Sequence, residues 1–121
     1  MTNPASILIV QDEFLEAERL RRLLEEAGYT VVGVAGRTGP ATQLARQHQP
    51  DLAIVDLMLE IDVDGIQTAT ELARHGLKIL ITTGFPDSVV EAAGAPELAC
   101  AIVKKPYSDG DLLTGVGACL A

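Results

Sequence analysis

Short apolar runs alternate along the chain with longer stretches in which apolar residues recur every three or four positions. Five of these runs are continuous and rich in branched side chains, as is typical of strands buried on both faces of a parallel sheet. They predict strands at residues 6–10, 29–35, 52–55, 77–83 and 98–103. The stretches between them each have one apolar face, which indicates amphipathic helices. These helices are expected at residues 14–27, 40–48, 65–75 and 87–93 and, after an N-cap at Ser108 or Asp109, up to residue 120.

This alternation predicts an α/β fold, a doubly wound five-stranded parallel sheet with helices on both faces. The 121 residues have the size of one domain, and no linker, repeat or low-complexity segment divides them. Residues 1–121 are therefore expected to form a single domain. The last helix is expected to need packing or a partner, because Gly110, Gly115 and Gly117 lower its propensity.

Charge and composition argue against several classes of function. The 9 basic and 17 acidic residues give a formal net charge of -8 without a basic stripe, so nucleic-acid binding is not expected. No apolar run reaches the length of a membrane span, and the first residues lack the pattern of a signal peptide. We therefore expect a soluble, cytoplasmic protein that does not bind membranes. Cys100 and Cys119 stand apart in apolar settings, which indicates reduced thiols in the core.

Polar residues directly follow or end four of the five predicted strands. Gln11 and Asp12 come after the first strand, and Asp56 ends the apolar run of the third. Thr83 closes the fourth strand, and Lys105 follows the fifth. Taken alone, Asp56 could simply begin a turn. However, parallel strands end at the same edge of a sheet, where ligands bind in open α/β folds, so one site can collect all these side chains.

The residue types in this set suit phosphoryl transfer to an aspartate. Two carboxylates held close together favour a hard divalent cation, either Mg²⁺ or Mn²⁺. Such a cation would neutralise charge while an oxygen of Asp56 attacks phosphorus in line. A lysine and a hydroxyl, here Lys105 and Thr83, can bind the other phosphoryl oxygens.

The same residues lie in segments that resemble the response-regulator receiver domains of the CheY-like superfamily. These segments are ILIVQDE, PDLAIVDL, DGI, ILITTG and KKPY, in order over nearly the whole chain. The resemblance implies a flavodoxin-like receiver fold in which Asp56 is the phosphoacceptor. It makes Asp12, Asp56 and the backbone carbonyl of Met58 metal ligands. It also makes Thr83 the hydroxyl that moves toward the phosphoryl group and Lys105 its ion-pair partner, with a cis peptide bond after Lys105.

Three features depart from the pattern of this family. Gln11 stands where an acidic residue is usual, which weakens attraction for the cation but still allows the amide to hold a metal-bound water. Ile102 replaces the usual aromatic switch residue. The loop from Asp56 to Gly65 lacks the common proline and is one residue longer than usual. This loop and the Thr-Gly pair of ILITTG are similar to stand-alone receivers with a Phe-Ala-Thr-Gly motif, many of them associated with HWE-type histidine kinases.

Other functions remain open. Gln11 alone favours a pseudoreceiver, which binds partners without being phosphorylated. Four other residues argue against it, namely Asp12, Asp56, Thr83 and Lys105. An aspartyl-phosphate phosphatase would use the same nucleophile, but it needs a second aspartate where Met58 stands. A flavodoxin-like cofactor binder needs a phosphate-binding loop after the first strand, where Asp12 and Glu13 would repel an anion.

The sequence therefore favours a non-enzymatic, single-domain response regulator of a two-component phosphorelay. A histidine kinase or phosphotransfer protein is the expected phosphodonor, and Mg²⁺ is the expected cofactor. Because no effector follows Ala121, the output is expected to be protein contacts or onward phosphate transfer. The fourth helix, the fifth strand and the last helix form the surface expected for a homodimer or a partner.

Overall fold

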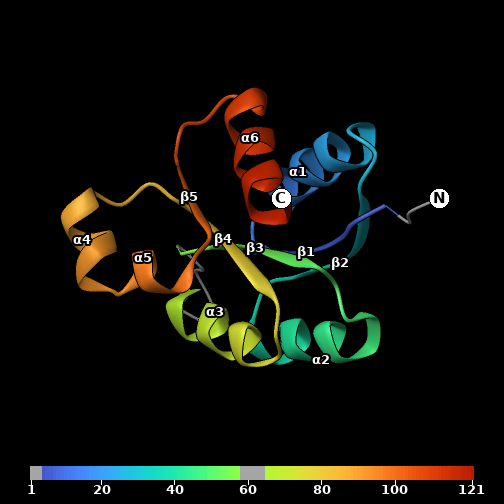
Figure 1. Cartoon of the computed structure of the whole chain (residues 1–121), viewed down its shortest axis with the longest axis horizontal. Coiled ribbons are helices and arrows are strands. Elements are labelled where there is room, and N and C mark those ends of the chain that lie inside the picture. The colour runs from blue at the N-terminus through green and yellow to red at the C-terminus, as the bar shows by residue number, and fades with distance from the viewer. Residues whose placement is uncertain (1–3, 58–64) are drawn as a thin grey trace.

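The computed structural model describes residues 4–57 and 65–121. In this part of the chain, strands and helices alternate largely as the sequence predicts (Figure 1). The strands are β1 (Ser6–Val10), β2 (Thr30–Ala35), β3 (Leu52–Asp56), β4 (Lys78–Thr83) and β5 (Ala101–Lys104). The helices are α1 (Phe14–Glu26), α2 (Thr38–His48), α3 (Gly65–Arg74), α4 (Asp87–Ala92), α5 (Ala95–Leu98) and α6 (Asp109–Leu120).

The strands form one parallel sheet in the order β2-β1-β3-β4-β5. Helices α1 and α6 cover one face of the sheet, whereas α2 and α3 cover the other (Figure 1). The short helices α4 and α5 lie near the edge formed by β5. The predicted doubly wound, five-stranded parallel sheet is therefore confirmed within the described residues.

The central strands are apolar because helices bury them from both sides. Residues 7–10 of β1 and 52–55 of β3 are at most 1% exposed. Alternate side chains enter two separate clusters, as the pleat of a strand requires. Leu8 packs with the apolar residues of α2 and α3, whereas Ile9 packs with those of α1 and α6. This packing on both faces holds the ends of the strands, and the polar residues that follow them, in fixed positions.

Strand β2 lies at an edge of the sheet and is irregular next to Gly33. The register shifts between Ile7, which pairs with Val31, and Leu8, which pairs with Gly33. A Cβ at Gly33 would lie 2.9 Å from Cδ1 of Leu44 in α2. Glycine at this position therefore allows α2 to approach the sheet closely.

The two helices on one face of the sheet begin with side-chain caps. The Glu13 carboxylate accepts hydrogen bonds from the backbone N–H groups of Leu15 and Glu16 at the start of α1. Ser108 caps α6 in a capping box with Asp111, so Ser108 is the N-cap of the two candidates in the sequence. Such a box satisfies backbone donors at the helix start and offsets part of the poor propensity of α6.

The prediction around the fifth strand is partly wrong. Strand β5 begins at Ala101 rather than at residue 98, because residues Ala95–Leu98 form the short helix α5. A segment of 4 residues is too short to show a helical period in the sequence. Pro96 lies in the first turn of α5, where proline is favoured, and it is the sequence feature that indicates a helix here.

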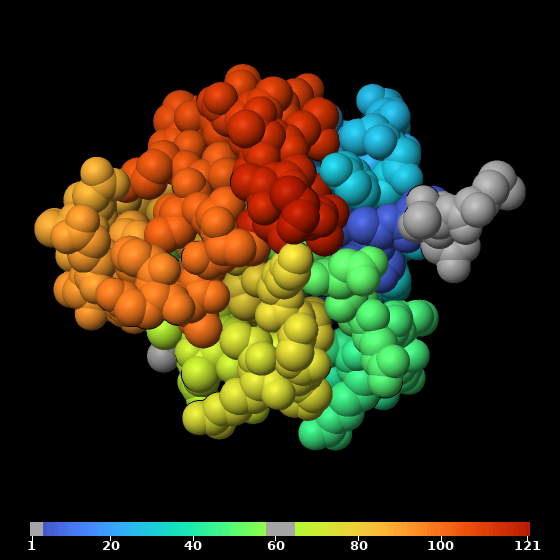
Figure 2. All heavy atoms as spheres, in the orientation of Figure 1, coloured from blue at the N-terminus to red at the C-terminus, as the bar shows by residue number. Residues whose placement is uncertain are grey.

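The prediction of reduced core thiols is also wrong. Cys100 and Cys119 form a disulfide, with Cα atoms 5.4 Å apart. The two residues are 19 positions apart in the sequence, but α6 packs against β5 and its last turn ends beside the start of that strand. Figure 2 shows the end of α6, in red, directly against the orange segment that includes β5. This proximity depends on the packing of α6 and is not visible in the spacing of the cysteines.

Candidate functional site

The predicted site residues gather at the carboxyl-terminal edge of the sheet. Asp56 is the last residue of β3, Gln11 follows β1, and Thr83 ends β4. Lys105 follows β5 and donates its backbone N–H to the carbonyl of Thr83 at 2.8 Å. The parallel pairing of these neighbouring strands therefore brings together residues that are far apart in the sequence.

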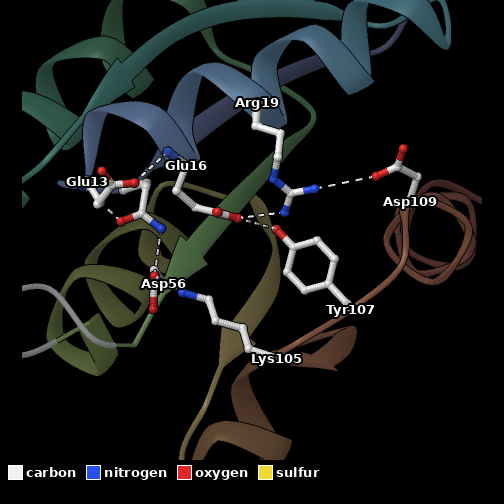
Figure 3. Close-up of polar contacts among 8 residues, drawn as sticks. Glu13, Glu16, Arg19, Asp56, Lys105, Tyr107 and Asp109 are labelled. Atoms are coloured by element: carbon white, nitrogen blue, oxygen red, sulfur yellow. Dashed lines mark hydrogen bonds and ion pairs between the residues drawn. The ribbon is translucent and has the colours of Figure 1, made fainter.

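The Asp56 carboxylate is buried and receives two donors on one oxygen. Asp56 is only 3% exposed. Lys105 Nζ donates to Asp56 Oδ2 at 2.5 Å, and Gln11 Nε2 donates to the same oxygen at 2.6 Å. Figure 3 shows Lys105 reaching toward Asp56 from the end of β5. Short contacts with a charged partner hold the carboxylate in one orientation.

The Gln11 side chain has a defined orientation in the site. Its Oε1 accepts a hydrogen bond from the Glu13 backbone N–H at 3.0 Å. Because this N–H can only donate, the amide oxygen faces Glu13 and the amide nitrogen faces Asp56. Gln11 is 6% exposed, so its amide belongs to the interior of the site.

The two neighbouring lysines at the end of β5 point in different directions. Lys105 points into the site, and its side chain is 29% exposed. Lys104 is exposed and forms an ion pair with Asp87 Oδ1 at 2.9 Å, and it also donates to the backbone carbonyl of Phe85. Successive side chains of a strand alternate in direction, which explains the difference. Lys105 is therefore the lysine of the site, and Lys104 belongs to the surface around α4.

Thr83 is fully buried where β4 ends. Its hydroxyl accepts a hydrogen bond from the Phe85 N–H at 3.0 Å. The preceding residue, Thr82, pairs with Asp56, and its carbonyl accepts the Leu57 N–H at 3.1 Å. The Thr83 hydroxyl therefore connects the end of β4 to the loop that enters α4, close to the strand that carries Asp56.

The described residues offer two carboxylates from adjacent strands as ligands for a metal ion. Asp12 follows β1 and Asp56 ends β3, and these strands pair side by side. Within residues 4–57 and 65–121, no group of three His, Cys, Asp or Glu residues could hold a metal. Two carboxylates still suit Mg²⁺, which keeps several of its waters and binds proteins through one or two carboxylates. Met58, the third predicted ligand, lies outside the described residues.

Gly65 supports Asp56 from the first residue of α3. A Cβ at Gly65 would lie 2.5 Å from the backbone oxygen of Asp56 and 2.6 Å from the Cα of Leu57. These are backbone atoms, so a larger residue would have to shift the end of β3 itself. The DGI segment contains this glycine, but its role as a close backbone contact depends on the structure.

A cluster of polar side chains beside the site is a feature that sequence reasoning missed. Tyr107 donates its hydroxyl proton to Glu16 Oε1 at 3.1 Å, and Arg19 donates to the same oxygen at 2.8 Å. The Arg19 guanidinium also lies 5.4 Å from the centre of the Tyr107 ring and 3.5 Å from Asp109 (Figure 3). We call Glu16, Arg19, Tyr107 and Asp109 the α1–α6 clamp. It joins α1 to the segment that leads from Lys105 into α6.

The clamp shifts the pKa values of its members. Burial, followed by the neighbouring Glu16 carboxylate, raises the pKa of the Tyr107 hydroxyl. Burial acts to raise the pKa of Glu16, but the hydrogen bonds from Arg19 and Tyr107 outweigh it, so the pKa of Glu16 is lowered. The clamp therefore contains an ionised Glu16 and a protonated Tyr107 at neutral pH.

The family model for the response regulator receiver domain matches residues 7–116 of the chain. The chain belongs to the response regulator receiver family. The fold agrees, because the signal receiver domain of a modulated diguanylate cyclase from Desulfovibrio desulfuricans G20 superimposes with a TM-score of 0.86. That domain is 31% identical, over 97% of this receiver and 94% of its own chain. Receiver domains in general bind Mg²⁺ at an acidic pocket.

Two curated relatives give further context for this receiver. Transcriptional regulatory protein PdtaR of Mycobacterium tuberculosis is 35% identical over 93% of this receiver and 55% of its own length. The receiver thus spans about half the length of PdtaR. Protein PilH of Pseudomonas aeruginosa is 29% identical over 97% of this receiver and 98% of its own length. Response regulators of this kind are generally non-enzymatic signalling proteins of two-component systems.

In the part of the chain that the structure describes, no helix is long and apolar enough to cross a membrane.

Proposed function

We propose that this receiver accepts a phosphoryl group on Asp56 from a histidine kinase or a phosphotransfer protein. One observation carries the proposal, which is the buried Asp56 carboxylate held by Lys105 Nζ at 2.5 Å at the edge of a parallel sheet. Burying such a pair is costly for stability, so its presence favours a role in chemistry over a role in folding. Membership of the family supports the same donors, since receiver domains interact with histidine kinases or phosphotransfer proteins.

In the proposed transfer, an oxygen of Asp56 attacks the phosphorus atom of a phosphohistidine. The new oxygen–phosphorus bond forms as the phosphorus–nitrogen bond breaks, and the departing histidine nitrogen keeps the electron pair and takes up a proton. Lys105 then pairs with a phosphoryl oxygen. The Thr83 hydroxyl turns from Phe85 toward the phosphoryl group. Asp12 and Asp56 would hold Mg²⁺, or Mn²⁺ in its place, which neutralises phosphoryl charge when bound.

In the same proposal, residues 1–121 act as one receiver in the cytoplasm, and the output consists of protein contacts or onward phosphate transfer. The surface of α4, β5 and α6 is the proposed place for a partner or a second copy of the chain. The Thr83 hydroxyl supports this choice because it contacts the loop that enters α4. Val89 on α4 is 45% exposed, which gives this surface an apolar contact point.

One observation favours a second function, that of a pseudoreceiver. Gln11 Nε2 donates to Asp56 Oδ2 at 2.6 Å, so the Asp56 carboxylate has partners without a cation or a phosphoryl group. A protein that binds partners without being phosphorylated would keep this arrangement permanently. The two functions differ in whether Asp56 ever carries phosphate.

Intact-protein mass spectrometry after incubation with a small phosphodonor and Mg²⁺ tests the proposal. The wild type is expected to gain the mass of one phosphoryl group, and Asp56→Asn is expected to gain nothing. Asp87→Asn removes an exposed carboxylate on α4 and serves as the matched control, which should gain as much as the wild type. A full gain in Asp56→Asn would contradict the proposal. If neither a small donor nor a phosphorylated histidine kinase modifies the wild type, the pseudoreceiver is favoured.

A further inference from the structure

Asp56 Oδ2 is shared by Gln11 and Lys105. Lys105 Nζ lies 2.5 Å from this oxygen and Gln11 Nε2 lies 2.6 Å from it. A carboxylate oxygen accepts about two hydrogen bonds along its lone pairs, so these donors fill the capacity of Oδ2. Lys105 contributes the positive charge, and the amide contributes the positive end of a dipole.

The Gln11 amide cannot easily be reversed to present its oxygen to the site. The Glu13 backbone N–H holds Gln11 Oε1 at 3.0 Å, and Glu13 itself caps α1. Turning the amide over would leave this N–H facing the amide nitrogen, which is also a donor in this geometry. The start of α1 therefore fixes the amide with its nitrogen toward Asp56.

A divalent cation bound by Asp12 and Asp56 would be attracted to the same Asp56 carboxylate that accepts a hydrogen bond from the Gln11 amide N–H. The N–H groups carry partial positive charge, so they repel a cation and compete with it for the Asp56 carboxylate. This competition is distinct from the simple loss of a ligand that a glutamine in place of an acid implies.

We propose that Gln11 is an internal competitor for the divalent cation: it holds Asp56 in the metal-free protein and lowers the affinity of the site for Mg²⁺. This inference rests on the proposed function, because that function includes the binding of Mg²⁺ by Asp12 and Asp56. The Gln11–Asp56 hydrogen bond weakens when the cation binds, and the cation binds less tightly because the bond exists. In the metal-free protein, the Gln11 amide thus holds the Asp56 carboxylate in place of the cation.

The variant Gln11→Met separates competition from the loss of a ligand. Methionine has a similar length and is apolar, so it removes the competing N–H groups without adding a ligand. Competition predicts that Gln11→Met binds Mg²⁺ more tightly than the wild type, on the order of tenfold for one hydrogen bond to a charged group. If Gln11 contributes to the cation site, even through a water, the same variant should bind Mg²⁺ more weakly.

Isothermal titration calorimetry measures the affinity of each variant for Mg²⁺, and two glutamate variants calibrate this measurement. Gln11→Glu is expected to bind Mg²⁺ more tightly than the wild type, which shows that the assay detects the site. Gln47→Glu adds the same charge at an exposed position of α2 and should leave the affinity unchanged. Far-ultraviolet circular dichroism on each variant establishes that it is folded.

Nuclear magnetic resonance gives a readout that does not depend on affinity. The side-chain amide signals of Gln11 are identified by their absence in Gln11→Met. They should shift when Mg²⁺ is added, and they should shift again in Asp56→Asn, because both changes alter the Gln11–Asp56 hydrogen bond. Gln11 signals that stay constant while backbone signals near Asp56 respond to Mg²⁺ would overturn the inference.

The outcomes separate this inference from the proposed function. If the wild type gains a phosphoryl group but Gln11→Met binds Mg²⁺ no more tightly, the competition is overturned and the proposed function stands. If Gln11→Met and Gln11→Glu both bind more tightly, the competition is supported. If no variant binds Mg²⁺ and none is phosphorylated, both proposals fail together.

Discussion

The two sides of the candidate site are held with very different strength. On one side, α1 and α6 have 13 and 12 residues, begin at side-chain caps and are joined by the α1–α6 clamp. On the other side, α4 and α5 have 6 and 4 residues, and neither of these two described helices has a side-chain cap. The Lys104–Asp87 ion pair on this side is exposed, and exposed pairs contribute little. The fold therefore fixes α1 and α6 and leaves α4 and α5 easier to move.

Thr83 lies toward the loosely held side. Its hydroxyl contacts the loop before α4, whereas Lys105 precedes the segment that the clamp holds. A rearrangement of Thr83 at a phosphorylated Asp56 would therefore reach α4 before it reaches α1. The two sides should therefore respond differently to local opening and to the loss of a polar contact.

Hydrogen exchange should reveal the largest difference between the two sides. Amides of α4 and α5 are expected to exchange on the order of a thousandfold faster than the central amides of α1, a difference of about 4 kcal/mol in opening free energy. The physical reason is that short helices without side-chain caps open locally. Exchange measured by mass spectrometry on peptides from both regions provides the check. Equal protection in the two regions would mean that α4 and α5 are held as firmly as α1.

Loss of the Cys100–Cys119 disulfide should have the next largest effect. The disulfide joins residues 19 positions apart, so reducing it increases the conformational entropy of the unfolded chain and releases the last turn of α6. The free energy of unfolding should fall by about 3 kcal/mol. Urea unfolding with and without a thiol reductant measures the difference. The reductant should not change the midpoint for Cys100→Ser, because the sequence contains 2 cysteines and this variant cannot form the link. An unchanged midpoint for the wild type would mean that the disulfide is absent in solution.

Breaking the clamp should cost about 1 kcal/mol. Glu16→Gln removes the negative charge of the carboxylate that accepts hydrogen bonds from Arg19 and Tyr107. The pKa of Glu16 is lowered in the folded state, so its contribution is present above the unfolded value of 4.5 and is lost as the pH falls through the folded value. Urea unfolding at several pH values should therefore show a gap between the wild type and Glu16→Gln that closes below pH 4.5.

The smallest effect is expected for Asp87→Asn on the other side of the site. This change removes the exposed ion pair with Lys104 and should alter the free energy of unfolding by about 0.5 kcal/mol or less. The same unfolding experiment serves for Glu16→Gln and Asp87→Asn, which both turn a carboxylate into an amide. A larger cost for Asp87→Asn than for Glu16→Gln would reverse the proposed order of the two sides.

Much of the fold could be predicted because the central strands are buried on both faces. Such strands read as continuous apolar runs, so the polar residue that ends each run is easy to find. Asp56 and Lys105 lie at the ends of two such strands, and they meet because parallel strands end at the same edge of the sheet. The helix α5 could not be predicted, since its 4 residues show no period.

The remaining features depend on packing between distant segments. Glu16 and Tyr107 are 91 residues apart and meet only because α1 and α6 share one face of the sheet. The direct contact of Gln11 with Asp56 depends on the Glu13 N–H, which orients the amide. The sequence predicts a weaker metal site because of Gln11, but the Gln11–Asp56 hydrogen bond is a property of the folded protein.

Identification of the modified residue shows directly whether Asp56 accepts the phosphoryl group. Borohydride reduces an acyl phosphate to an alcohol, so a phosphorylated aspartate becomes homoserine and can be located by peptide mass spectrometry. After treatment with a phosphodonor and Mg²⁺, we predict homoserine at Asp56 in the wild type and at no other aspartate. Homoserine at a different aspartate, or none in a sample that has gained a phosphoryl mass, would contradict the assignment of Asp56 as the phosphoacceptor.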